Sequence, residues 1–369
     1  MIKICFTGDF IPPSQNLLSY SSELQKIIKD KDVSLTNFEA PITVNNTKIS
    51  KTGNNYKINS TSIQHIINST FDVVTLANNH IRDYGNEGVI DTLNFCKENG
   101  IYIVGAGINF VEAAKPLKLT IKDKKIAILN YCEHEFNLAS SNDAGANPFD
   151  VVSAYNDIIR EKKENDYVLV VYHGGIEYQY LPTPEMVRNF KFMIDIGADT
   201  VVAHHTHRYS GAIYYNNKPL LFGLGNFLAP TKAKITDEWL TGLLAKIYID
   251  DSIKFQLYPI KMNNSFTKME LLENEEKIKI LTHIKQINEI IEDKKSFDDY
   301  WEKEYLKAKI WLFNMIKSNS RFKYRIRKYL PFLFRHRISE YKRNTLLNIV
   351  RCESHRNRLI KVLQMLETK

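Results

Sequence analysis

The sequence predicts an α/β fold for about the first 268 residues and a helical extension after them. Strand-like and helix-like segments alternate from residue 1 to about residue 262. Beyond about residue 268 strand patterns disappear, and Leu, Ile, Trp and Tyr recur at three- and four-residue intervals among charged residues. Polar residues, histidines among them, end several predicted strands. We therefore expect an α/β domain at residues 1–268 and a basic, aromatic-rich helical extension at 269–369.

The domain opens with a strand at 1–9, where apolar and polar residues alternate. The apolar spacing of 21–32 is typical of a helix, and the following strand, 33–41, is stopped by a proline. A helix at 60–70 is expected to lead into the apolar strand 71–77.

The central part continues with a helix at 85–100, which ends on a glycine suited to a C-cap, and a strand at 101–107. Segments 116–121 and 126–131 flank a short charged turn and predict a hairpin. A helix is expected at 150–165.

In the last part of the α/β domain, predicted strands again alternate with a helix. A strand at 166–175 precedes the helix 183–197, which has Pro in its first turn and Gly at its end. The apolar strand 199–205 follows, and then a hairpin at 211–226 that turns at two asparagines. Two final strands within 240–261 flank a pair of aspartates.

The charge of the chain is unevenly distributed. Residues 321–369 carry 14 Lys and Arg against 3 Asp and Glu, whereas residues 1–320 carry 36 against 39. The net charge of +8 therefore belongs to the extension. The stretch 320–343 interleaves basic and aromatic residues and has three interpretations: a helical subdomain packed on the α/β domain, a segment at a membrane surface, or a nucleic-acid site. The last is disfavoured because no recognised binding motif accompanies the charge.

The composition favours a cytoplasmic protein, and the basic extension adds peripheral contact with the inner membrane face as an alternative. The N-terminus lacks the features of a signal peptide, and no uninterrupted apolar run approaches the roughly 20 residues of a membrane span. No C-x-x-C pair suggests a zinc knuckle or a disulfide framework. The four cysteines are scattered, at Cys5, Cys96, Cys132 and Cys352.

Metal-ligand side chains recur where predicted strands end. Carboxylate, amide and imidazole groups drawn from several strands suit divalent metals of borderline hardness, such as Mn²⁺, Fe²⁺ or Zn²⁺. Each group alone has a simpler explanation as a turn, a cap or a buried histidine, but the set in this order favours a metal centre. Its members are Asp9, Asn37, Glu39, Asn78, Asn79, His80, Asp83, His173, His205, His207 and Asn226.

The order of these blocks, from Gly8-Asp9 through Asn78-Asn79-His80 and His204–His207 to Gly225-Asn226, resembles the CapA family. These poly-γ-glutamate capsule synthesis proteins are a branch of the calcineurin-like metallophosphatase superfamily. The resemblance covers about residues 2–262. It implies a four-layer α-β-β-α sandwich with a two-metal centre at one edge.

The resemblance also implies roles for individual residues. Asp9 would bind the first metal, Glu39 would bridge both, and Asn79 and His173 would bind the second, with His205 and His207 divided between them. His80 would take the position of the catalytic histidine, and Asp83 would orient it or cap a helix. The candidates for substrate contact are Asn37, Glu177, Tyr178, His204 and Asn226, although strand alternation points His204 to the opposite face from its neighbours.

Two features depart from the wider superfamily. Ile11 stands where a histidine commonly follows the first aspartate, and Glu39 stands where the bridging ligand is commonly Asp. Both changes fit the CapA pattern, and they reshape the first metal site. A further stretch, Glu133–Glu135, ends another strand, and its residues either reach the cleft or lie in an exposed loop.

Three functions are compatible with this pattern. The first is a two-metal hydrolase acting on a phosphorylated or polymeric envelope precursor. The second is a metal-dependent epimerase in which His80 or His134 abstracts a proton. The third is a non-catalytic capsule-assembly protein that binds polymer or a membrane synthase. We favour the hydrolase because all six expected ligand positions hold competent ligands.

Overall fold

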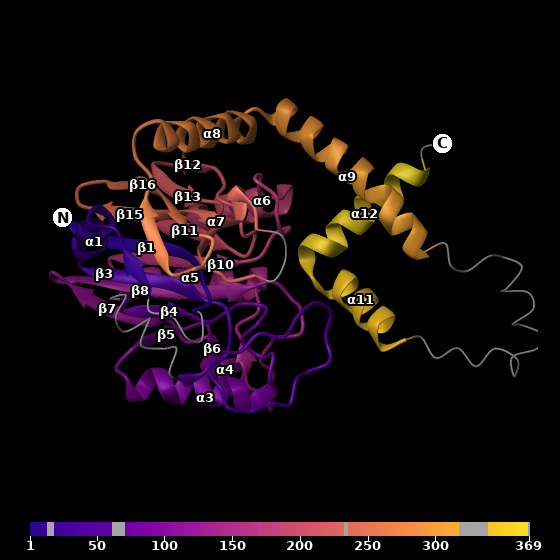
Figure 1. Ribbon diagram of the computed structural model, residues 1–369, viewed down its shortest axis with the longest axis horizontal. Coiled ribbons are helices and arrows are strands. Elements are labelled where there is room, and N and C mark those ends of the chain that lie inside the picture. Colours follow the sequence, from indigo (N-terminus) through magenta and orange to yellow (C-terminus); the bar gives the residue numbers. More distant parts are fainter. Residues whose placement is uncertain (13–17, 61–70, 232–234, 317–338, 368–369) are drawn as a thin grey trace, which may run out of the picture. The chain divides into compact units, whose positions relative to one another are not determined.

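The computed structural model describes residues 1–12, 18–60, 71–231, 235–316 and 339–367 (Figure 1). It comprises two compact units. The first contains Met1–Ile49 and Asn55–Glu289, and the second contains Ser50–Asn54 and Ile290–Lys369. No helix in the described part of the chain is long and apolar enough to cross a membrane.

The larger sheet of the first unit has the strand order β2-β17-β16-β15-β1-β3-β4-β5, and β14 pairs with the end of β1. The central strand β1 is parallel to β3 and antiparallel to β15. The strands are β1 (Ile2–Phe10), β2 (Ser19–Tyr20), β3 (Val33–Phe38), β4 (Val73–Thr75), β5 (Tyr102–Val104), β14 (Asn226–Leu228), β15 (Thr241–Ile249), β16 (Ile253–Met262) and β17 (Lys268–Leu271).

The smaller sheet has the order β12-β13-β11-β10-β8-β7, and its central strands β8, β10, β11 and β13 are parallel. Its strands are β7 (Leu117–Ile121), β8 (Lys124–Cys132), β10 (Tyr167–His173), β11 (Thr200–His204), β12 (Ala212–Tyr215) and β13 (Lys218–Leu221). A separate ribbon pairs β6 (Ala106–Gly107) with β9 (Gly145–Ala146).

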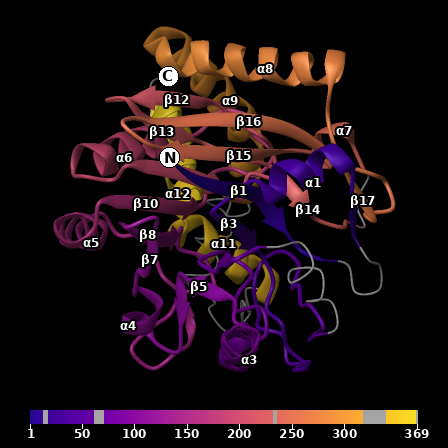
Figure 2. The same cartoon turned by 90° about the vertical axis from the view of Figure 1, so that its left-hand side faces the viewer.

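Helices cover the outer faces of the two sheets. Helices α1 (Ser22–Lys29) and α3 (Gly85–Glu98) pack their apolar residues into the core on one face of the larger sheet. Helices α5 (Val151–Glu164) and α6 (Pro184–Asp195) pack on β8, β10 and β11, and Figure 2 shows them on the side opposite α1. The expected four-layer α-β-β-α sandwich is therefore confirmed.

Short helices and one long helix complete this unit. Helices α4 (Phe110–Ala113) and α7 (Asp237–Leu240) are single turns, each capped by a side chain at its N-terminus. Helix α8 (Asn274–Glu292) packs against the sandwich, because the Asn288 amide bonds both the N–H and the carbonyl of Ala212 at 2.8 Å. The first unit therefore extends to Glu289, beyond the boundary at residue 268 expected from the sequence.

Apart from the segment Ser50–Asn54, the described residues of the second unit are mainly helical. It contains α9 (Lys294–Ile316), α11 (Glu340–Arg351) and α12 (Glu353–Glu367), and α12 packs on both α9 and α11. Its buried side chains include Trp301 and Tyr305 on α9 and Val362 on α12. Most of the basic-aromatic stretch 320–343 lies outside the described residues, as does nearly all of the helix expected at 60–70.

The strand expected at 101–107 is broken into β5 and β6 by Gly105. Gly105 has φ +93°, and a Cβ there would lie 2.0 Å from the side-chain oxygen of Asn130. The break therefore follows from a left-handed backbone and a close side-chain approach, neither of which apolar periodicity records.

Gly8 allows β1 and β14 to approach each other directly before Asp9. A Cβ at Gly8 would lie 1.9 Å from the carbonyl oxygen of Gly225, which accepts a hydrogen bond from Asp9 N at 2.9 Å. We expect Gly8→Ala to lower the free energy of unfolding by about 3 kcal/mol, because backbone must move. Urea unfolding measures this loss. Gly100→Ala, with φ +68° but open space around its Cβ, should cost only about 1 kcal/mol; equal losses would contradict the steric explanation.

Candidate metal centre

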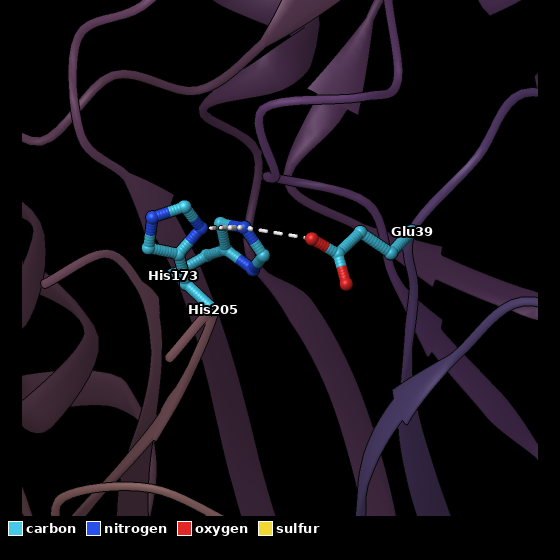
Figure 3. Close-up of side chains that lie close together, drawn as sticks. All are labelled: Glu39, His173 and His205. Carbon is cyan, nitrogen blue, oxygen red and sulfur yellow. Dashed lines mark hydrogen bonds and ion pairs between the residues drawn. The ribbon is translucent and has the colours of Figure 1, made fainter. Parts of the chain in front are cut away.

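Strand ends from both sheets meet in one buried cluster. Asp9 is the penultimate residue of β1, and Glu39 follows β3; both are fully buried. His173 ends β10, while His205 and His207 follow β11. Figure 3 shows the Glu39 carboxylate opposite His173 and His205. The carboxyl ends of parallel strands therefore bring distant residues together, as expected for an α/β fold.

The two histidines after β11 share a site through an unusual backbone. The strand ends at His204, so the alternation expected for His205 and His207 does not apply. Instead, His205 has φ +96° and His207 has φ +54°. Each such conformation in a non-glycine residue costs on the order of 1–3 kcal/mol and is concentrated at functional sites. The turn, and not strand periodicity, directs both rings to the cluster.

The ligand atoms form two groups that share one carboxylate. Asp9, Glu39 and His207 make up the first group, and Glu39, His173 and His205 the second; the ligand atoms of each group lie within 4.8 Å of one another. Glu39 is thus common to both groups.

Distances within the cluster are short. His207 Nδ1 lies 3.3 Å from Asp9 Oδ2, and its Nε2 lies 4.0 Å from Glu39 Oε1. His173 Nε2 lies 3.5 Å from Glu39 Oε1 and 3.1 Å from His205 Nδ1. Asn79 adds an amide oxygen 3.1 Å from His173 Nε2. All six residues expected to bind metal therefore meet in one place.

The electrostatics of the cluster fit divalent cations. Burial lowers the pKa of His173 well below its usual value, with the neighbouring His205 adding to the effect, so this imidazole is neutral, as a ligand must be. For His207, burial lowers the pKa, but Glu39 and Asp9 outweigh it and raise the pKa to about 10. A positive charge is therefore favoured beside these two carboxylates. Three imidazoles, two carboxylates and one amide oxygen suit Mn, Fe or Zn.

Amide side chains hold the ligands in place. Asn37, expected to contact substrate, is buried, donates to Asp9 Oδ1 at 2.7 Å and lies 3.2 Å from His173 Nδ1. It therefore orients one ligand of each group. Asn226 accepts from His207 Nδ1 at 2.9 Å, so Nε2 is the ring nitrogen that this hydrogen bond leaves for a metal. Asn37 and Asn226 are thus placed to position ligands.

His80 is paired with an aspartate beside the cluster. Its Nδ1 lies 2.7 Å from Asp83 Oδ2, and Asp83 also accepts from Tyr56 N at 2.7 Å. The Tyr56 ring packs against the edge of the imidazole, with centroids 4.7 Å apart. The bond to Asp83 holds a proton on Nδ1 and fixes the orientation of the ring. Nε2 therefore lies on the side of the imidazole that faces away from Asp83.

The other residues expected to contact substrate do not all lie at the cluster. Glu177 and Tyr178 are exposed, and the Tyr178 ring lies 6.2 Å from that of His207. His204 does not join the cluster: its Nε2 lies 2.9 Å from the carbonyl oxygen of Thr7, on the facing sheet, and it is buried. Its expected role in substrate contact is therefore not supported by its position.

Trp239 borders the centre, and Glu133 lies in the interior next to Tyr172. Trp239, which the strand-end pattern did not identify, lies 5.1 Å from His207 between ring centroids and 6.2 Å from Tyr178. Glu133 is buried and accepts from the Tyr172 hydroxyl at 3.3 Å, so the exposed-loop interpretation is wrong for this residue. His134 and Glu135 are partly buried.

Comparison with known proteins identifies related sequences. The family model for the bacterial capsule synthesis protein PGA_cap matches residues 5–231. The PGA biosynthesis protein CapA of Bacillus subtilis is 31% identical over 210 residues, 56% of this chain and 55% of that protein. The capsule biosynthesis protein CapA of Bacillus anthracis is 33% identical over 164 residues, 43% of this chain and 40% of that protein. A probable polyglutamine synthesis accessory protein of Mycobacterium tuberculosis is 26% identical over 208 residues, 53% of this chain and 55% of that protein. The chain thus spans about half the length of the curated relatives it matches.

Solved structures give more distant matches. A putative 5'-nucleotidase from Staphylococcus aureus in complex with α-ketoglutarate aligns with 77% of this chain and 58% of its own, at 14% identity and a TM-score of 0.46. A 5'-nucleotidase precursor from Thermus thermophilus aligns with 79% of this chain and 60% of its own, at 11% identity and a TM-score of 0.43.

Proposed function

Because this chain belongs to the bacterial capsule synthesis protein family PGA_cap, the CapA branch of the calcineurin-like metallophosphatase superfamily, we propose that it is a metal-dependent hydrolase. Its substrate would be a phosphorylated or polymeric precursor in the synthesis of a capsule or cell-envelope polymer. The observation that carries the proposal is the pair of buried ligand groups sharing Glu39. A structural role for the fold needs no such concentration of buried carboxylates and imidazoles.

The proposed ligand assignment follows the two groups. Asp9 and His207 would hold one cation, His173, His205 and Asn79 the other, and Glu39 both. Two divalent cations, when bound, supply positive charge that polarises a phosphoester and activates water for attack. We infer the metals to be Mn, Fe or Zn from the donor set.

The chain's own residues would supply the proton and the substrate contacts. His80 directly follows Asn79 in the sequence. Its Nε2 would donate a proton to the leaving oxygen, while the hydrogen bond from Nδ1 to Asp83 would hold the ring in place. Tyr178 and Trp239, which flank His207, would contact the part of the substrate next to the reacting group.

Metal content and hydrolysis, measured on the same preparations, test this function. Protein purified without chelators is expected to hold about two Mn, Fe or Zn ions per chain and to release nitrophenol from p-nitrophenyl phosphate or its diester. His205→Ala should remove one ion and lower the rate at least about 100-fold. His283→Ala is the matched control, because this α8 histidine hydrogen-bonds Tyr209 at 2.8 Å, outside both ligand groups.

Other outcomes point to other functions. Deuterium from solvent appearing at a substrate Cα, without phosphate release, would favour epimerisation. Absence of bound metal after reloading, together with capture of a membrane synthase, would favour the non-catalytic assembly role.

A further inference from the structure

Two aromatic rings, those of Tyr178 and Trp239, lie beside the candidate metal centre. Their centroids are 6.2 and 5.1 Å, respectively, from the centroid of the His207 ring. Tyr178 is 53% exposed and Trp239 is partly buried, so both rings can be reached from solvent. We call this pair the aromatic platform. Aromatic faces contact the apolar faces of ligand rings, so the platform is placed to hold the group next to a reacting phosphate.

The backbone of Tyr178 is strained, although its side chain buries little surface. Tyr178 has φ +66°, in the left-handed region that favours glycine, and its N–H donates to the carbonyl of Thr206 at 2.8 Å. Thr206 lies between two of the proposed metal ligands. Burial of a large side chain can offset such strain, but about half of this ring remains exposed. Contact with a ligand therefore explains a tyrosine at this position better than folding does.

Trp239 is held in a fixed orientation. Its indole Nε1 donates to the carbonyl of Ala229 at 2.8 Å, and its own carbonyl accepts from the Asn226 amide at 3.0 Å. The same Asn226 side chain accepts from His207 Nδ1. One residue thus connects the platform to a metal ligand, so the distance from the platform to the centre is set before any ligand binds.

The geometry of the two rings favours a ligand that lies over them. Their centroids are 6.2 Å apart and their planes are inclined by 36°. A flat ring inserted between two others needs parallel planes about 7 Å apart, because each stacking contact takes up roughly 3.5 Å. A ligand ring therefore contacts the platform from one side. A sugar ring suits such a contact, since its C–H groups form an apolar face and its hydroxyl groups surround the rim.

The charged groups beside the platform favour a neutral ligand with hydroxyl groups. Glu177 precedes Tyr178, Glu238 precedes Trp239, and both glutamates are exposed. The Glu238 carboxylate lies 3.5 Å from the Arg208 guanidinium. Carboxylates accept hydrogen bonds from hydroxyl groups, and they repel a second negative charge on a ligand.

We propose that the substrate is the phosphomonoester of a neutral sugar, whose ring lies over the aromatic platform. This inference rests on the proposed hydrolase function and names its substrate class. Water attacks the phosphorus, the bond from phosphorus to the sugar oxygen breaks, and that oxygen takes up a proton. The products are the sugar and inorganic phosphate. Tyr178 and Trp239 contact the ring face, and Glu177 and Glu238 accept hydrogen bonds from the hydroxyl groups.

Hydrolysis of glucose 1-phosphate and of glycerol 3-phosphate, which has no ring, tests the proposal. Tyr178→Ala should raise KM for glucose 1-phosphate at least about tenfold with little change in kcat, because the ring contact is the same before and during reaction. KM for glycerol 3-phosphate should stay within about twofold. Tyr178→Phe keeps the ring and should behave like the parent. Tyr102→Ala is the matched control, since this tyrosine on β5 is 54% exposed and outside the platform.

Equilibrium binding separates this inference from the hydrolase function. Fluorescence of Trp239, identified by its loss in Trp239→Phe, reports binding of glucose 1-phosphate whether or not the ester is hydrolysed. Saturable binding that Tyr178→Ala weakens, without hydrolysis of either ester, would support the sugar site and contradict the hydrolase. Three results would each overturn the sugar assignment: equal rises in KM for both esters, tighter binding of AMP with its planar base, or no saturable binding of glucose 1-phosphate.

Discussion

Replacing Glu39 by Gln is expected to empty both metal positions, with metal content falling from about two ions per chain to fewer than one. Glu39 is the residue common to both ligand groups, and its carboxylate lies 3.5 Å from His173 and 4.0 Å from His207. Gln has nearly the same shape but carries no charge, so it cannot offset two cations in a buried site. Hydrolysis should fall about 1,000-fold, because several kcal/mol of charge stabilisation are lost.

Single-group variants provide the comparison. Asp9→Asn changes the first group alone and His205→Ala the second alone, so each should retain about one ion. Mass spectrometry of purified chains measures the metal, and thermal unfolding measures the stability with and without added Mn²⁺. Bound metal raises the unfolding temperature of the unaltered chain. That rise should disappear in Glu39→Gln, because the variant no longer binds the metal that stabilises the folded chain. A Glu39→Gln chain that keeps two ions would contradict the shared-ligand assignment.

The class of fold could be predicted from the sequence because strands and helices here carry strong local signals. β10 is a continuous apolar run that ends at His173, and α6 has a capping Thr183 followed by Pro184. The meeting of the candidate ligands could be predicted from the same signals, since the carboxyl ends of parallel strands gather at one edge. These local signals do not define how the two sheets face each other; the expected four-layer sandwich came from the family resemblance.

Side-chain directions beyond the strand ends were less predictable. His204 and His205 are neighbours, yet one bonds Thr7 on the facing sheet and the other contacts His173. The positive φ values of His205 and His207 decide this outcome, and no pattern of apolar residues encodes them. Trp239 was missed for a related reason: it lies in the single turn α7, just before a predicted strand and not after the carboxyl end of one, and tertiary packing brings it to His207.

The boundary between the units illustrates a different limit. Helix α8 has the same charged, periodic texture as the helices of the second unit. Its assignment to the first unit depends on specific contacts, the Asn288 amide with Ala212 and His283 with Tyr209. Texture alone does not distinguish a helix that packs on the sandwich from a helix of the second unit.

Replacing His80 by Ala is expected to lower kcat about 100- to 10,000-fold while both ions remain bound, the range for loss of a general acid. His80 is paired with Asp83 at 2.7 Å and belongs to neither ligand group. Asp83→Asn should have a smaller effect, about 10- to 100-fold, because the imidazole stays in place but loses the carboxylate that fixes its tautomer and stabilises its protonated form. Steady-state kinetics with a phosphoester, together with metal analysis, separates these effects.

Asp91→Asn serves as the control for Asp83→Asn. Asp91 also accepts a hydrogen bond, from the Thr43 hydroxyl, but on α3 and away from His80. This variant should hydrolyse substrate at the parent rate. Added imidazole should restore part of the activity of His80→Ala, since a small base can occupy the space left by the ring. Loss of metal in His80→Ala would show that His80 is a ligand, and an unchanged kcat would show that it takes no part in the reaction. Metal content, kcat and rescue by imidazole together therefore assign its role.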